Sequence, residues 1–525
     1  MKHIQVLDCT LRDGGYCNEC RFGFENEKKI IRSLIEANID IIECGFLMNL
    51  DTYNKDLTKF SSLEQVAEII PENRKGKLFV VLTDYGKYNP DELPDYDGTT
   101  VDGLRIAFHK KDRAEAIEEC KKVKEKGYKV FVQAMVSVSY TDLEFLDLIE
   151  RMNELEPYAF YIVDSFGMMK RKDLIRLFYL VEHNLKKSIK IGFHSHNNMQ
   201  LAFSNAQSLV ETESDRNLII DSSVYGMGRG AGNLNTELFV DYLNETFEEK
   251  YILKPLLSII DEILNGFYQK NHWGYSLPNY LSAANNTHPN YASFLDDKKT
   301  LTVEAMNDIF NIMDDEKKYS FDKDYIEEIY FNYMESGKVQ KSHREELNLL
   351  LKEKKVLLVA PGKSSKEEVE TIKKAAKKEN MITISVNFDY EEISTEFIFL
   401  SNLRRFRELD KEKRPKCIIT SNIPSDRCYL KAEYRTLLCE EEAVCDNAGL
   451  MAIKFLVNCG VQEIYLAGFD GYTHNANENY GNSQMELIMR NAVLDAMNVG
   501  MTKVLKKYMK KVSIQFVTRP RHILI

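Results

Sequence analysis

The sequence predicts an α/β protein in which an N-terminal (β/α)8 TIM barrel with a helical extension precedes a C-terminal open-sheet, Rossmann-like domain. Two observations carry this prediction. Eight short apolar, β-branched segments recur along the first half of the chain, and most of the intervals between them are charged and helix-patterned. A second series of apolar segments follows near the C-terminus. At 525 residues, the chain is also too long for one ordinary core.

The eight N-terminal segments are expected to be parallel strands, because strand and helix alternate along the chain. They begin near His3, Ile39, Leu78, Leu104, Lys129, Ala159, Lys190 and Leu218. Eight units of one strand and one helix fit a closed barrel. A long open sheet is the alternative, and we disfavour it because such sheets seldom keep eight uniform units.

We expect four parts in the chain: a barrel in 1–240, a helical extension in 241–335, a polar linker or connecting helix in 336–355, and the Rossmann-like domain in 356–525. The role of the last domain stays open. The turn after 355–362 could accept a nucleotide phosphate at a helix N-terminus, or the domain could serve substrate delivery or oligomerisation.

Composition narrows the class of partner. Hydrophobic residues make up 44% and charged residues 29% of the chain, which is a normal globular balance. A net charge of −11 without a basic tract argues against nucleic acid and anionic membranes as partners. Ten scattered cysteines, no long apolar run and no signal peptide indicate a cytoplasmic protein. We expect a small-molecule substrate, and a homo-oligomer remains open.

Candidate metal ligands stand where strands of the barrel end. His194 and His196 are two residues apart, so on a strand both imidazoles point to one face. Asp13 follows the first strand and opens onto the same barrel mouth. Two imidazoles and a carboxylate suit Mn²⁺ or Mg²⁺, with Co²⁺ and Zn²⁺ as alternatives. Two ordinary histidines near a strand end are the other interpretation.

Two further features adjoin this group. Arg12, beside Asp13, could stabilise a developing enolate or alkoxide, or it could simply form a structural ion pair. The loop that carries Gly228, Gly230 and Gly232 could bind a substrate phosphate or carboxylate through its backbone N–H groups. A simple tight turn accounts for these glycines equally well.

Five segments in order, LDCTLRDGGY, IIECGF, VDSFG, GFHSHNN and GMGRGAGNLNTE, resemble the DRE-TIM metallolyases, also called HMGL-like, and among them the 4-hydroxy-2-oxovalerate aldolase type. The resemblance spans roughly residues 3–240 and, more loosely, the region to about 330. It implies a divalent metal held by Asp13, His194 and His196. It further implies that Asn233 ligates or approaches the metal, that Arg12 stabilises the enolate, and that Glu43 is a pocket carboxylate.

The resemblance implies a metal-dependent aldolase that cleaves or forms a 4-hydroxy-2-oxoacid through a pyruvate enolate. The glycine-rich loop lacks the cysteine of the lyases that act on a CoA thioester. Tyr16 stands where valerate-type aldolases carry a histidine, so Tyr16 and His109 are the candidate bases. The alternatives are an acetyl-CoA-dependent Claisen-condensing acyltransferase similar to isopropylmalate or homocitrate synthase, and a non-catalytic binding or scaffold protein.

A weaker resemblance concerns the last domain. Residues 446–472 are similar to part of bacterial sialyltransferase-like nucleotide-sugar domains. If this holds, the residues of interest are Asp446, Asn447, Asp470 and His474.

Overall fold

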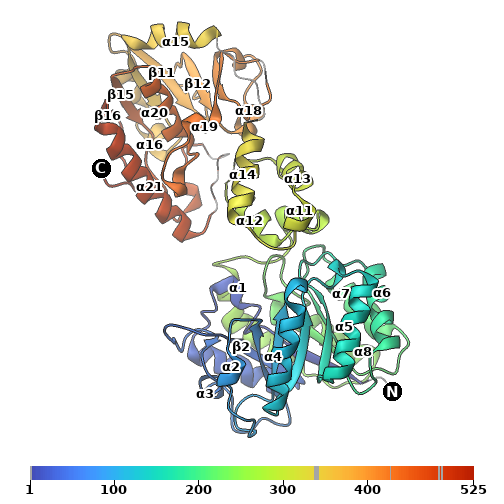
Figure 1. The fold of residues 1–525 in the computed structure, drawn as a ribbon. Helices are drawn as coiled ribbons and strands as arrows, with labels where there is room; N and C mark the ends of the chain where they lie inside the picture. Colours follow the sequence, from blue (N-terminus) through green and yellow to red (C-terminus); the bar gives the residue numbers. More distant parts are fainter. Residues whose placement is uncertain are drawn as a thin grey trace. The chain divides into compact units, whose positions relative to one another are not determined.

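The computed structural model describes residues 3–298, 300–335, 342–425, 427–482, 485, 487 and 489–525. The chain folds into two compact units (Figure 1). The first consists of Met1–Ala292 and Asp314–Phe321, and the second of Ser293–Met313 and Asp322–Ile525. The chain therefore leaves the first unit, returns to it for one short segment, and leaves it again.

The first unit is built on a closed barrel of eight parallel strands, as the sequence predicted. Strand β1 pairs with both β2 and β9, and these pairings close the sheet. A two-residue strand, β3 (Lys59–Phe60), adds to the side of β2. The barrel strands are β1 (Ile4–Asp8), β2 (Ile41–Leu47), β4 (Leu78–Asp84), β5 (Gly103–Phe108), β6 (Lys129–Ala134), β7 (Ala159–Asp164), β8 (Lys190–Ser195) and β9 (Leu218–Ser222).

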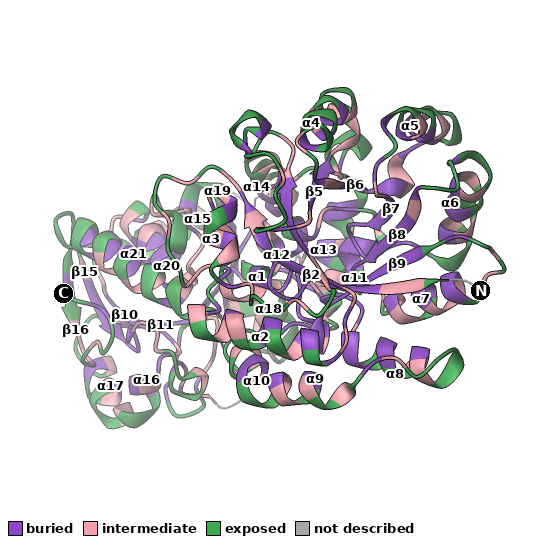
Figure 2. Cartoon of the chain, turned by 90° about the horizontal axis from the view of Figure 1, so that it is seen from below, coloured by how far each residue is buried: buried purple, intermediate pink, exposed green. Residues whose placement is uncertain are grey.

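Helices surround the barrel and turn their apolar faces inward (Figure 2). Ile30, Ile31 and Leu34 of α2 are fully buried, and they recur at the spacing of one helix face. The side chain of Thr141 caps α5 in a reciprocal pairing with Glu144. The helices of the barrel are α1 (Gly15–Asn18), α2 (Phe24–Glu36), α3 (Leu63–Ala67), α4 (Arg113–Glu125), α5 (Asp142–Leu155), α6 (Arg171–Asn184), α7 (Ala202–Glu211) and α8 (Thr236–Thr246).

A short helical segment extends the first unit beyond the barrel. It contains α9 (Leu253–Ile259), a π-helical turn (Ile260–Leu264), α10 (Asn265–Tyr268), α11 (Leu277–Ala284) and the start of α12 (Pro289–Asp297). Its Ala283 packs in a small apolar cluster with Val136, Phe166 and Met168, which follow strands β6 and β7. The returning segment adds Tyr319, whose ring stacks on Phe166 with the ring centres 6.4 Å apart. These contacts place the extension at the carboxyl ends of the barrel strands.

The second unit contains an open parallel sheet, which confirms the predicted second α/β fold. Its strand order is β14-β13-β12-β11-β10-β15-β16, so the order reverses between β10 and β15. The strands are β10 (Lys355–Val359), β11 (Met381–Val386), β12 (Phe397–Leu400), β13 (Cys417–Thr420), β14 (Leu430–Ala432), β15 (Glu463–Ala467) and β16 (Ser513–Phe516). The sequence analysis missed β14, because its three residues include a lysine and form no apolar run.

Within the described residues, eight further helices belong wholly to the second unit. They are α13 (Val303–Asn311), α14 (Lys323–Met334), α15 (Ser342–Lys352), α16 (Lys363–Glu367), α17 (Val369–Ala376), α18 (Leu403–Glu408), α20 (Ala448–Asn458) and α21 (Asn491–Met509), beside the single turn α19 (Tyr434–Leu437). Residues 336–341 of the predicted linker lie outside the described residues. The helices of 241–335 are divided between the two units, and the predicted domain boundaries stay a prediction.

The turn after β10 already holds an acidic side chain. The Asp470 carboxylate accepts hydrogen bonds from the backbone N–H of Ser364, at 2.7 Å, and from the Ser364 hydroxyl. This places a negative charge at the start of α16, where the sequence analysis considered a phosphate. Asp446 accepts hydrogen bonds from two tyrosines, Asn447 caps α20, and His474 pairs with Asp495, so the four residues of interest all have local partners.

No helix in the described parts of the chain is both long enough and apolar enough to span a bilayer.

A fragment ending at residue 335 should not behave as a free barrel. It keeps α14 but loses α19, against which that helix packs. Ile326 and Tyr330 are fully buried, and the Tyr330 hydroxyl bonds to Tyr434 and Asp446 in the deleted part. We expect the 1–335 fragment to self-associate in size-exclusion chromatography at concentrations where the full chain runs as one defined species. A monodisperse fragment with an intact near-UV circular dichroism spectrum contradicts this expectation.

Candidate active site

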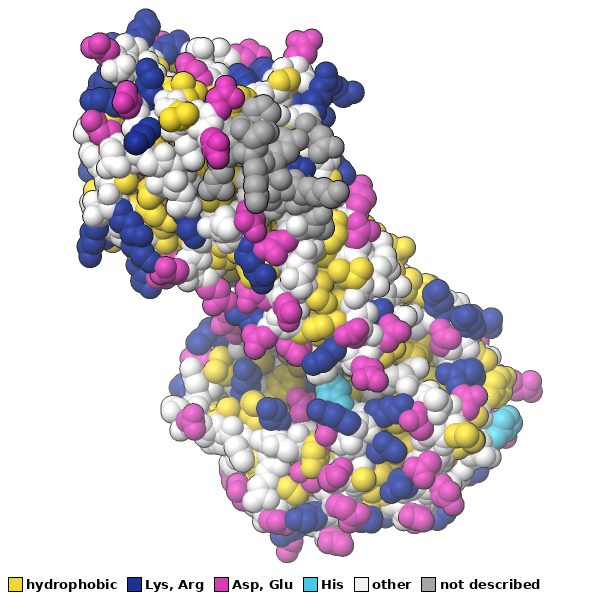
Figure 3. Space-filling view, turned by 45° about the horizontal axis from the view of Figure 1, so that its top comes forward, with side chains coloured by type: hydrophobic (Ala, Val, Ile, Leu, Met, Phe, Trp, Pro, Cys, Tyr) yellow, Lys and Arg dark blue, Asp and Glu magenta, His cyan; other side chains and the backbone are white. Residues whose placement is uncertain are grey.

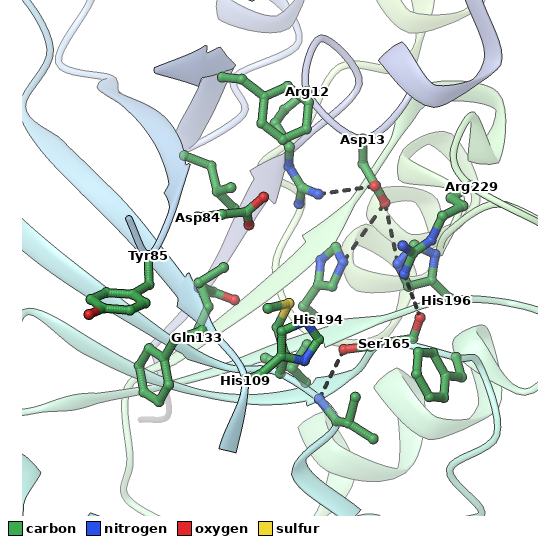
Figure 4. A pocket seen from close by; sticks show the side chains of 18 of the residues that line it. Arg12, Asp13, Asp84, Tyr85, His109, Gln133, Ser165, His194, His196 and Arg229 are labelled. Atoms are coloured by element: carbon green, nitrogen blue, oxygen red, sulfur yellow. Dashed lines mark hydrogen bonds and ion pairs between the residues drawn. The ribbon is translucent and has the colours of Figure 1, made fainter. Parts of the chain in front are cut away.

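A cavity of about 280 Å³ opens at the carboxyl ends of the barrel strands. Figure 3 shows the barrel unit hollowed there, with hydrophobic, acidic and basic side chains and a histidine around the hollow. The ionisable side chains in the cavity wall are those of Arg12, Asp13, Tyr16, Asp84, Tyr85, Lys87, His109, Asp112, His194, His196, Arg229 and His288. Figure 4 shows Arg12, His194 and His196 directed at Asp13.

Asp13, His194 and His196 form a buried group of three donors. The Oδ2 atom of Asp13 lies 3.8 Å from Nε2 of His194 and 3.6 Å from Nε2 of His196. One ligand atom from each residue lies within 4.8 Å of the other two, and all three side chains are buried. Two imidazoles and one carboxylate at this spacing are a fitting donor set for a divalent cation.

The local charges prepare these groups to bind a cation. Burial alone would raise the pKa of Asp13, but the Arg12 guanidinium, together with the two histidines and Arg229, outweighs burial and holds that pKa well below its usual value. Burial lowers the pKa of His196 to about 3. Asp13 is therefore ionised and His196 neutral near pH 7, which are the protonation states that metal ligation requires.

Asn233 lies against this group, as the sequence analysis anticipated. Its Nδ2 atom donates to Oδ2 of Asp13 at 2.6 Å, while its Oδ1 atom is buried without a hydrogen-bond partner. A buried carbonyl oxygen without a partner is costly unless something else satisfies it. With its amide turned over, Asn233 would present this oxygen, in place of Nδ2, to a cation held by Asp13.

Two backbone features bring these side chains together. The backbone N–H groups of Arg12 and Asp13 both bond to the carbonyl oxygen of Cys9, at 3.1 and 2.8 Å, so the chain turns sharply after β1. At the end of β8, His196 forms an isolated β-bridge with Asn233. The loop after β9 is thus fastened to the strand that carries both histidines.

The three predicted loop glycines allow the close contacts of this loop, because a larger side chain at any of them would clash with a neighbouring residue. A side chain at Gly228 would meet the Asn233 amide at 2.4 Å, and one at Gly232 would meet the carbonyl oxygen of Gly226 at 2.0 Å. Gly232 also has a φ of +82°, in the region that favours glycine. The residue by which this loop reaches the cavity is Arg229. Direct substrate contacts by Gly228, Gly230 and Gly232 stay a prediction.

A series of buried ion pairs connects Asp13 to His194 through four other charged side chains. Arg12 bonds to Asp13 through Nη1 at 3.0 Å and to Glu43 through Nε at 2.8 Å. Glu43 in turn pairs with Arg105 at 3.0 Å, and Arg105 pairs with Asp221. We call Asp13, Arg12, Glu43, Arg105, Asp221 and His194 the charge ring.

The charge ring closes on His194, one of the three candidate metal ligands. Asp221 Oδ2 lies 2.9 Å from Nδ1 of His194, whose Nε2 atom faces Asp13. Because the ionised Asp221 can only accept, Nδ1 carries the proton and Nε2 presents its lone pair to the cation position. The ring's three carboxylates outnumber its two guanidiniums, which leaves one buried negative charge for a cation to neutralise.

Of the other predicted catalytic residues, two line the cavity and one lies behind it. Tyr16 and His109 both line the cavity. Burial lowers the pKa of His109, so its imidazole is neutral near pH 7. Glu43 is fully buried behind Arg12 instead of lining the cavity, so it orients that arginine.

Sequence reasoning missed Arg105, Asp221, Arg229 and His288. Arg105 and Asp221 interrupt the apolar strands β5 and β9, and a charged residue inside such a strand is seldom buried without a partner. That pattern could have revealed both. Arg229 stands within the glycine-rich loop, where the sequence drew attention to the backbone and not to side chains. His288 lies far along the chain in the helical extension, where no strand-end rule applies.

Comparisons with known proteins match about half of this chain. The sequence model of the HMGL-like family matches residues 101–259. A 4-hydroxy-2-oxovalerate aldolase of Geobacillus genomosp. 3 is 28% identical over 268 residues, which cover 48% of this chain and 78% of that protein. A 4-hydroxy-2-oxovalerate aldolase of Thermomicrobium roseum is 30% identical over 248 residues, which cover 46% of this chain and 67% of that protein.

Among solved structures, an N-terminal domain from Bacteroides vulgatus matches with 28% identity and a TM-score of 0.49, covering 57% of this chain and 98% of that domain. Family membership follows from the two aldolases, one of which is 30% identical to this chain across two thirds of its own length. Their names and the family match make this chain an enzyme of the aldolase and lyase type. The chain belongs to the HMGL-like family, the DRE-TIM metallolyases.

Proposed function

We propose that the barrel is a divalent-cation-dependent aldolase that cleaves or forms a 4-hydroxy-2-oxoacid by way of a pyruvate enolate. The observation that carries this proposal is the juxtaposition of Arg12 with the buried Asp13, His194 and His196 group at one wall of a small cavity. The two aldolase relatives add support, since both are called 4-hydroxy-2-oxovalerate aldolases.

Asp13, His194 and His196 would hold the cation, with Asn233 beside them. We propose Mn²⁺ or Mg²⁺, with Co²⁺ and Zn²⁺ as alternatives, since this donor set suits all four. When bound, the cation supplies a Lewis acid that draws electron density from the oxoacid oxygens.

Arg12 would stabilise the enolate oxygen. Its Nε and Nη1 atoms are committed to Glu43 and Asp13, while Nη2 makes no hydrogen bond to any described residue. The guanidinium is thereby held rigidly at the cavity wall with one nitrogen available to substrate. A fixed cation stabilises developing negative charge without reorganising during the reaction.

His109 is our choice for the base, because a neutral imidazole can accept a proton whereas the Tyr16 phenol is already protonated at neutral pH. In cleavage, the 4-hydroxyl proton passes to His109 and the O–H electron pair forms the aldehyde C=O bond. The C3–C4 bond breaks, and its electron pair becomes the enolate. A proton then returns to C3 and gives pyruvate. Tyr16, in the same wall, serves as a hydrogen-bond donor.

The cavity volume of about 280 Å³ favours a small oxoacid and aldehyde over a substrate as large as a CoA thioester. As part of the same proposal, we keep the expectations of a cytoplasmic enzyme with small-molecule substrates, without nucleic acid or membrane partners, and with homo-oligomerisation open.

Pyruvate enolisation tests the function before any aldehyde is known. In D₂O, the protein loaded with Mg²⁺ should exchange deuterium into the pyruvate methyl group, because the enolate that forms in the aldol reaction is reprotonated at C3. Proton NMR of pyruvate follows the exchange, and chelator-treated protein is the control. No exchange above the rate of the chelator-treated control with Mg²⁺, Mn²⁺, Co²⁺ or Zn²⁺ contradicts the proposal.

Asp13→Asn should abolish tight metal binding, since it removes the only carboxylate of the donor set. Elemental analysis of purified, folded protein measures the metal content. Asp84→Asn is the matched control: Asp84 lines the same cavity but lies outside the donor set, and its variant should retain the metal. Equal metal content in both variants and the wild type means that Asp13 is not a ligand.

Arg12→Lys should keep the metal but lower the rate of methyl exchange by about 100-fold, because lysine preserves the charge without the planar fork that bonds Glu43 and Asp13 while reaching substrate. Metal titration and exchange rates, measured on the same preparation, separate the two effects. An unchanged exchange rate assigns Arg12 a structural role only.

A further inference from the structure

One histidine in the cavity wall comes from outside the eight strand–helix units of the barrel. His288 lies between α11 and α12, in the helical extension, yet it lines the same cavity as His109 and Arg229. The eight barrel loops supply the cation group and Arg12. The extension supplies this imidazole, and no step of the proposed reaction so far uses it.

The loop of His288 is held in place by several contacts. Its backbone N–H bonds to the carbonyl oxygen of Lys318 at 2.8 Å, in the segment that returns to the first unit. The imidazole packs edge-on to Phe166, with 5.3 Å between ring centres. The nearby Tyr291 hydroxyl lies 2.9 and 2.7 Å from the carbonyl oxygens of Lys317 and Ser320. The imidazole is thus fixed from both sides of the loop.

The hydrogen bonds also fix which ring nitrogen carries the proton. Nδ1 of His288 accepts a hydrogen bond from the backbone N–H of Asn290 at 3.1 Å. A neutral imidazole whose Nδ1 accepts must carry its proton on Nε2. Among the described residues, none bonds to Nε2. A cavity-lining side chain therefore presents one N–H donor without a partner.

His288 is neutral at any working pH. Burial and the positive charge of Arg229 lower its pKa to about 3. A neutral imidazole with Nε2 protonated is a poor base, because its only lone pair is engaged with Asn290. It is, however, a good electrophilic hydrogen-bond donor, able to polarise a carbonyl group without releasing its proton.

We propose that His288 donates its Nε2 proton in a hydrogen bond to the C4 oxygen of the substrate, and so positions the aldehyde. In synthesis, the aldehyde oxygen gains negative charge as its carbon bonds to the enolate, and the N–H stabilises that oxygen. In cleavage, the same N–H holds the 4-hydroxyl oxygen while His109 removes the hydroxyl proton. This inference rests on the proposed aldolase function and assigns its aldehyde subsite.

Of the two half-reactions, only addition to the aldehyde should depend on His288. Enolisation of pyruvate involves only the C1–C3 end and needs no aldehyde, so removal of His288 should leave it intact. Addition to an aldehyde requires the C4 oxygen, so the same removal should slow it. Loss of one preorganised donor to an oxyanion lowers a rate by about 100-fold or more.

The test compares methyl exchange of pyruvate with aldol addition of pyruvate to acetaldehyde, propionaldehyde and glycolaldehyde. The variants are His288→Phe, which keeps an aromatic ring without the donor, and His288→Gln, which restores a neutral N–H. His183→Gln, at an exposed position on α6, is the matched control. We expect exchange within twofold of wild type in all variants. Addition should fall about 100-fold in His288→Phe and recover in part in His288→Gln.

Each other outcome has a definite meaning. Aldol addition at the wild-type rate in His288→Phe overturns the proposal. An equal loss of exchange and addition also overturns it, since His288 would then act at the pyruvate end or only support the fold. Wild-type exchange without addition to any of the three aldehydes refutes a donor role at an aldehyde oxygen. Absence of exchange in the wild type refutes the proposed function itself, and this inference with it.

Discussion

The charge ring is the constraint on which the barrel mouth depends. Asp13, Arg12, Glu43, Arg105, Asp221 and His194 contact one another in sequence, and each is buried. Removing one partner from a buried ion pair typically costs about 3–5 kcal/mol, because the other charge is left uncompensated. The ring therefore ties the orientation of His194, a candidate metal ligand, to side chains from several different strand–helix units. Its one excess negative charge favours the binding of a cation beside Asp13.

The position of the site follows from the way the chain is arranged around this ring. Parallel strands bring all eight carboxyl ends to one face, so residues from distant parts of the sequence share one cavity. The helical extension packs on that same face through Phe166 and adds His288, which the barrel loops do not provide. The returning segment Asp314–Phe321 holds the extension in place through Lys318 and Tyr319. The chain thus passes through residues 293–313 of the second unit before it supplies the last segment of the first unit, Asp314–Phe321.

Much of the barrel and its site could be predicted from the sequence, and the exceptions have physical reasons. All eight barrel strands were predicted, because apolar β-branched segments that alternate with helical intervals are typical of parallel α/β folds. Asp13, His194 and His196 were predicted to meet because strand-end positions in a barrel must converge. Glu43 was predicted to be a pocket carboxylate, but in the structure it lies behind Arg12 and does not line the cavity. A sequence motif places the residue at a strand end, but it does not show which neighbouring side chain that residue will contact. Arg105 and His288 were missed, because their partners lie on elements distant in sequence and only the folded chain brings them together.

The most direct measurement of the central claim is anomalous X-ray diffraction from crystals of the full chain grown with Mn²⁺. The account predicts a manganese peak about 2.0–2.3 Å from Oδ2 of Asp13 and from Nε2 of both His194 and His196. It also predicts that His194 keeps its Nδ1 contact with Asp221. A manganese peak bound only elsewhere, with Asp13 and the two histidines free of metal, would contradict the account.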